Sequence, residues 1–189
     1  MQTLGLSEST PKTEGRLKNL FWPSIRNEVD VDYLGRQGYW ICFGVAVVTL
    51  AFNLFTGSVW GGIFESTFFF LGGVGVRARS RFAAIAVFCA YLLSALLLQR
   101  LTGQGFGILR IIFLALLLAN IRGTWLSAMW RTSATEPPPM PLDKTIWDKL
   151  SDRLPIFLWP KTKWILYVMA VLENAALVFA LFAPREWLK

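Results

Sequence analysis

The sequence contains no histidine, and its 189 residues include only two cysteines. The absence of histidine excludes His-ligated zinc, haem and facial-triad iron sites, together with Ser-His-Asp and Cys-His catalysis. Cys42 and Cys89 both fall in apolar stretches, so we interpret them as packing residues. We expect no metal and no cofactor other than a bound lipid or pigment.

Charged residues are also scarce. They make up 16% of the chain, whereas hydrophobic residues make up 54%. A soluble domain carries about 25% charged residues, and a disordered chain carries more. These proportions exclude both classes and indicate an integral membrane protein.

Five apolar stretches approach the roughly 20 residues that a helix needs to cross a bilayer. Their bounds are Tyr39–Thr56, Val59–Val76, Phe82–Leu98, Phe106–Trp125 and Trp164–Ala183. They lack the alternation of a β-barrel strand, so we predict an all-α, polytopic transmembrane bundle of about five spans. The second stretch contains Glu65 and five glycines, which leaves a re-entrant segment as its alternative. The arginines that follow it favour a full span.

Lys and Arg are distributed unevenly between the two sets of loops. Fifteen of the 19 basic residues fall on the side of the N-terminus and four on the other side. By the positive-inside rule the N-terminus is cytoplasmic and the C-terminus external. Acids alternate with bases here, five of each in the first 37 residues, which argues against nucleic-acid binding.

The chain divides into four parts along its length. Residues 1–38 form a cytoplasmic segment, residues 39–130 hold four spans, and residues 164–189 form the fifth span and external end. Between them, residues 131–163 contain the proline-rich linker Glu136–Pro141 and a short amphipathic helix that we expect to end before Pro155. This helix would lie on the cytoplasmic interface or dock on a partner. The expected lipid and interface anchors are Trp22, Arg122, Trp125, Trp130, Trp147 and Trp159.

Four polar residues fall inside the apolar stretches: Glu65, Arg110, Glu173 and Asn174. A charged side chain at the bilayer centre costs roughly 3 kcal/mol or more, so such residues face the bundle interior and pair. The carboxyls have four readings: a proton or cation path or a substrate contact, a neutral Glu hydrogen-bonded to another helix, pairing with Arg110, or contact with a partner or pigment.

Two short motifs carry a resemblance. The segment Gly75-Val-Arg-Ala-Arg-Ser-Arg81-Phe-Ala-Ala and the segment Asn120-Ile-Arg-Gly-Thr-Trp125 resemble small bacterial multi-span membrane proteins of unknown function. In these, an acidic residue in the second span, here Glu65, precedes a basic turn. The resemblance covers about residues 20–130. It implies a bacterial inner-membrane location and no activity.

No catalytic constellation or nucleotide motif is present, so we expect a protein that is not an enzyme. The leading hypothesis is a non-catalytic accessory subunit of a larger, energy-transducing membrane complex that contacts lipids, pigments or quinone. Its partners would be membrane lipids and other integral membrane subunits. The alternatives are a small oligomeric transporter or channel that uses Glu65 and Glu173, and a lipid-associated envelope factor that uses Arg122 and the interfacial helix.

Overall fold

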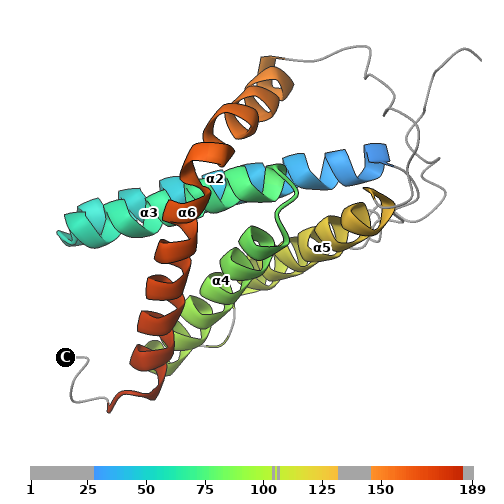
Figure 1. The fold of residues 1–189 in the computed structure, drawn as a ribbon. Coiled ribbons are helices and arrows are strands. Elements are labelled where there is room, and N and C mark those ends of the chain that lie inside the picture. Colours follow the sequence, from blue (N-terminus) through green and yellow to red (C-terminus); the bar gives the residue numbers. More distant parts are fainter. Residues whose placement is uncertain (1–27, 104, 106, 132–145, 185–189) are drawn as a thin grey trace, which may run out of the picture.

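The computed structural model describes residues 28–103, 105, 107–131 and 146–184, and these residues are helical apart from short turns. The helices are α2 (Glu28–Thr56), α3 (Val59–Arg77), α4 (Arg81–Thr102), α5 (Ile108–Arg131) and α6 (Ile146–Phe182). Each contains a stretch long and apolar enough to cross a membrane. The prediction of an all-α, multi-pass membrane protein is therefore confirmed, with five helices as candidate spans by length and hydropathy (Figure 1).

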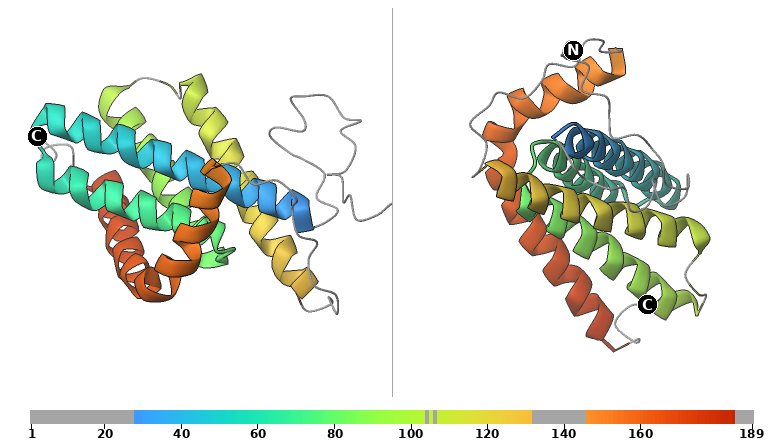
Figure 2. Two further views of the ribbon diagram at one scale, coloured as in Figure 1. Left: turned by 90° about the horizontal axis from the view of Figure 1, so that it is seen from above. Right: turned by 90° about the vertical axis from the view of Figure 1, so that its right-hand side faces the viewer.

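The helices form two layers. Helices α2 and α3 lie side by side as an antiparallel hairpin, and α4 lies between α5 and α6 (Figures 1 and 2). The hairpin packs across the second layer, because α2 contacts α5 while α3 contacts both α4 and α6. Residues distant in sequence, on α3 and α6, are thereby brought together.

Two tight turns fix the path of the first three spans. Gly57 joins α2 to α3 with a φ of 80°, a left-handed conformation that glycine adopts without a steric cost. Between α3 and α4, Arg79 has a φ of 59°, and the Ser80 hydroxyl accepts a hydrogen bond from the Ala83 amide at 3.3 Å. This bond caps the first turn of α4. The basic turn and the Gly57 turn lie at opposite ends of α3.

The core lies where the helices cross. It contains the buried side chains Cys42, Phe68, Phe69, Val87, Ala90, Leu117, Leu166 and Ala170, which come from all five helices. Gly73 lets α2 and α3 approach closely, because a Cβ there would lie 2.8 Å from the Cys42 Cβ. Large apolar side chains point outward elsewhere, as Phe55 does at 92% exposure. Such a surface suits lipid rather than water.

Helix α2 begins before the predicted first span. It starts at Glu28, so residue 38 is not a structural boundary. Val31 and Leu34 lie one helical turn apart and are both buried, and Leu34 packs against Gly123 of α5. The polar residues between them lower the local hydropathy, so the sequence does not predict that the helix begins this early.

Helix α6 corrects a second expectation. No separate amphipathic helix is present among the described residues, because α6 continues through Pro155 and Pro160 from Ile146 to Phe182. A proline removes one backbone hydrogen bond and bends a helix, and next to Pro160 the Trp159 ring packs against Gly75 of α3. Figure 1 shows α6 changing direction between its orange and red parts. The linker Glu136–Pro141 lies outside the described residues.

Candidate functional site

The structure brings together the two carboxyls that sequence analysis singled out. Glu65 lies on α3 and Glu173 on α6, each well inside its candidate span. Helices α3 and α6 pack against each other, so the two carboxyls stand on neighbouring helices. Both side chains are partly exposed, so the pair lies at the edge of the bundle rather than in its core.

The described residues supply no basic partner for these two carboxyls. Neither Glu65 nor Glu173 forms an ion pair with any residue that the structure describes. Arg110 lies on α5, within its first turn. The expected pairing of a glutamate with Arg110 is therefore not found among the described side chains, which leaves the other readings of the carboxyls.

Asn174 ties the carboxyl pair to α4. Its Nδ2 atom donates to the carbonyl oxygen of Ala170 at 2.8 Å and to that of Ala86, on α4, at 3.5 Å. Its Oδ1 atom is buried and accepts no hydrogen bond from the described residues. The Asn174 side chain is thus held where α6 packs on α4, and this contact fixes the position of its neighbour Glu173 relative to α4.

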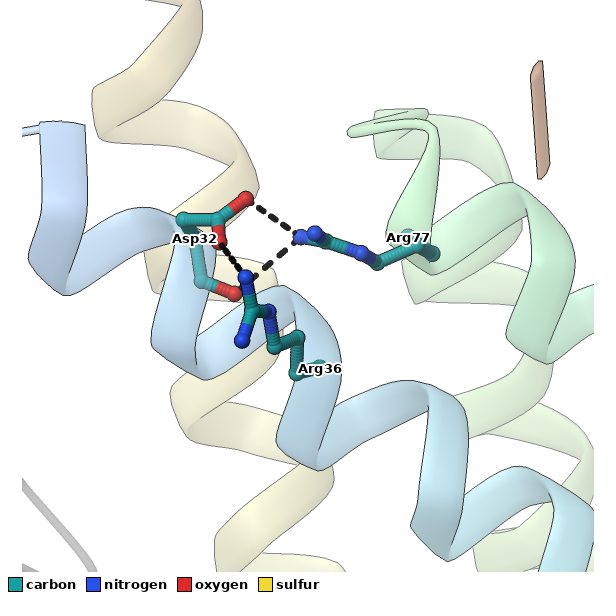
Figure 3. Close-up of polar contacts among 3 residues, drawn as sticks. All are labelled: Asp32, Arg36 and Arg77. Carbon is teal, nitrogen blue, oxygen red and sulfur yellow. Dashed lines mark hydrogen bonds and ion pairs between the residues drawn. The ribbon is translucent and has the colours of Figure 1, made fainter. Parts of the chain in front are cut away.

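A second polar cluster, which sequence analysis missed, joins α2 to α3 at the basic end of the molecule. Arg77 donates through Nη1 to the Asp32 carboxylate at 2.6 Å and to the Asp32 carbonyl oxygen at 3.2 Å (Figure 3). The Arg36 Nη2 atom lies 3.1 Å from the other carboxylate oxygen. The spacing of Asp32 and Arg36, four residues apart on one helix face, was the available signal.

Three of the predicted interface anchors can be placed. Trp125, on α5, is about half exposed, and the Arg81 guanidinium lies over its ring at 5.2 Å. Arg122 lies one turn earlier on the same helix and is partly buried. Trp159 is more than a lipid anchor, because a Cβ on Gly75 would lie 2.5 Å from its ring. Trp22 and the side chains of Trp130 and Trp147 lie outside the described residues.

Comparison with known proteins adds no identification: no family model, no curated protein and no solved structure matches the chain. The resemblance to small bacterial multi-span proteins therefore stays a prediction. Among the described residues, no group of three or more His, Cys, Asp or Glu side chains could hold a metal ion. In the part of the chain that the structure describes, the main polar features are two carboxyls inside candidate spans and a cluster of arginines at the end of α3.

Proposed function

We propose that this protein is a non-catalytic subunit of a larger membrane assembly. The observation that carries the proposal is the partly exposed pair Glu65 and Glu173, which no described basic residue neutralises. A carboxyl at this depth is costly against lipid, so it favours a polar or basic group as a neighbour. A partner helix at the α3–α6 edge would supply that group.

The outer surface of the bundle supports the same proposal. Within the most apolar stretch of each helix, only 17% of the α6 residues and 22% of the α2 residues are buried by the rest of the chain. Both helices therefore offer most of their surface to lipid or to neighbouring subunits. Trp164 and Phe179, on α6, are exposed and would provide aromatic contacts to a partner, a pigment or a quinone.

The experiment is purification in mild detergent with crosslinking. The full chain should carry other integral membrane proteins with it, and the double variant Glu65→Ala, Glu173→Ala should lose them. Ser66→Ala is the matched control, because Ser66 neighbours Glu65 and its hydroxyl bonds only within its own helix, to the Ile63 carbonyl. A chain that purifies alone, or a double variant that keeps its partners, contradicts the proposal.

The second candidate function is a small transporter or channel for protons or monovalent cations. It is favoured by the position of Glu65 and Glu173 inside candidate spans of two helices that pack together, because carboxyls at such positions can carry a proton or a cation. The test is flux into liposomes that contain the purified chain alone. Flux lost in Glu65→Gln, Glu173→Gln with the fold intact supports the transporter and contradicts the subunit. Absence of flux in the wild type contradicts the transporter.

We further propose that the basic face is the cytoplasmic face of a bacterial inner membrane. Arg36, Arg77 and Arg81 lie at one end of the bundle, around the turn between α3 and α4. The contact of Trp159 with Gly75 brings the start of the fifth candidate span, with Lys161 and Lys163, to the same end. Arg100 and Arg110 lie toward the opposite end. This distribution supports the orientation expected from the positive-inside rule.

A further inference from the structure

The basic end of the bundle contains two kinds of arginine. Arg77 is largely buried, with 8% of its side chain exposed, and it binds Asp32 together with Arg36. The Asp32 carboxylate holds both arginines, and its contact with Arg77 joins α2 to α3. Arg81 differs, because it is exposed and its described contact is with the Trp125 ring. The turn therefore presents one guanidinium outward beside an aromatic ring.

The position of Arg81 places it where lipid phosphates lie. It is the first residue of α4 and follows directly on the turn that ends α3, so it stands at a membrane face if both helices span. Trp125 belongs to α5, and its half-exposed indole is typical of the headgroup level. The contact between Arg81 and Trp125 thus joins α4 to α5 at the end of the bundle where the basic turn lies.

The chemistry of this pair suits a phosphate oxygen. A guanidinium carries five N–H donors in one plane, which matches two oxygens of a phosphate in a forked contact. An aromatic ring beside it restrains the long side chain and leaves those donors available. Arg77 and Arg79 add positive charge within the same turn, where Asp32 is the one acidic side chain that the structure describes.

We propose that Arg81 and Trp125 form a binding site for the phosphate headgroup of an anionic phospholipid, with the basic turn supplying further positive charge. The site prefers phosphatidylglycerol over phosphatidylcholine, because the latter carries a compensating choline charge. This proposal does not depend on the proposed function, since it uses neither Glu65 nor Glu173.

The test is native mass spectrometry of the full chain purified in detergent and titrated with phosphatidylglycerol or phosphatidylcholine. The wild type should retain the anionic lipid preferentially. Arg81→Gln should weaken that binding about tenfold, the effect of losing one charged hydrogen-bonded contact. The matched control is Lys161→Gln, at an exposed lysine of α6 rather than α4. The Lys161 Nζ atom lies 4.1 Å from the centre of the Phe157 ring on the same helix.

Three results would overturn the site. The first is equal retention of the two lipids by the wild type, and the second is an equal loss in Arg81→Gln and Lys161→Gln, which indicates diffuse attraction only. The third is competition by free inorganic phosphate at the lipid concentration used, which indicates an anion site without a lipid requirement. If Arg81→Gln does not fold, Arg81→Lys decides: a reduced preference for phosphatidylglycerol supports the site and an unchanged preference contradicts it.

Discussion

Asp32 holds arginines from two helices with one carboxylate. One oxygen accepts from Arg77 of α3 and the other lies beside Arg36 of its own helix (Figure 3). The two contacts differ in surroundings, because the Arg77 side chain is 8% exposed and that of Arg36 is 21% exposed. A buried charge depends on its counter-ion far more than an exposed one, so the contact with Arg77 should dominate the effect of losing Asp32.

We therefore expect Asp32→Asn to lower the free energy of unfolding by about 3 kcal/mol, because Arg77 would face an amide instead of a carboxylate. Arg36→Gln is the comparison, with an expected loss of about 0.5 kcal/mol for an i,i+4 pair near the surface. Unfolding in mixed micelles, followed by circular dichroism, measures both. Equal losses in the two variants would show that the link between α2 and α3 adds nothing to stability.

Gly73 marks the closest approach of α2 to α3. A methyl group there would lie 2.8 Å from the Cys42 Cβ and 3.2 Å from the Tyr39 carbonyl oxygen, and a backbone atom cannot move aside cheaply. Gly73→Ala should therefore cost about 1–3 kcal/mol of stability. Gly44→Ala is the control, because no atom lies within 4 Å of its added Cβ. Thermal melts in mixed micelles, followed by circular dichroism, measure both variants. A melting temperature of Gly73→Ala that is no lower than that of Gly44→Ala would refute the close contact.

At the scale of the element, α6 is held at its C-terminal end by a residue of α4. The Arg100 guanidinium donates to the carbonyl oxygens of Ala180 at 3.1 Å and Ala183 at 2.7 Å, and also to that of Leu181. The last carbonyls of a helix have no partner within the helix, and an arginine both binds them and complements the helix dipole. Arg100 thus fixes the end of α6 against the end of α4.

Replacing Arg100 by leucine should release this end of α6. We expect a loss of about 2 kcal/mol, as for other charge-assisted hydrogen bonds. Faster hydrogen exchange should be confined to the last turn, where the Ala183 amide now donates to Phe179. Arg100→Lys keeps the charge and should recover part of the protection. Exchange measured by mass spectrometry separates the variants, and unchanged rates in Arg100→Leu would argue against the cap.

The spans could be predicted from sequence because burial in lipid requires an apolar residue at nearly every position of a helix. The ends of α2 and α6 could not, for different physical reasons. Val31 and Leu34 form a narrow apolar face among charges, and Pro155 and Pro160 are strong helix breakers in water. In α2 the contact of Leu34 with α5 overrides the local signal, and in α6 the Trp159 ring packs on α3 next to Pro160. The pairing of Asp32 with Arg77 also depends on packing, since 45 residues separate them.

At the scale of the whole molecule, the placement of Glu65 beside Glu173 required the structure. Each residue was recognisable from its cost in lipid, but hydropathy does not report the rotation of a helix about its axis or which helices are neighbours. Contact of α3 with α6 settles both. It also brings Trp159 of α6 against Gly75, close to the basic turn that ends α3.

The five candidate spans and the proposed cytoplasmic location of the basic end make a labelling prediction for the full-length chain. In a variant whose Cys42 and Cys89 are replaced by alanine, single cysteines are introduced at the turns. Ala78→Cys and Lys161→Cys should react with an impermeant maleimide only in inverted vesicles, because both lie at the basic end. Ser58→Cys and Thr102→Cys, at the other ends of α3 and α4, should react only in intact spheroplasts.

Two departures from this expected labelling pattern would have different meanings. Reaction of Ser58→Cys and Ala78→Cys from the same side would show that α3, with Glu65 and its five glycines, is re-entrant rather than a full span. Exchange of the two sides with the pattern kept would preserve five spans and reverse the orientation. That second result would also move Arg81 and Trp125 to the external leaflet, where the lipid titration would apply unchanged to the lipids of that leaflet.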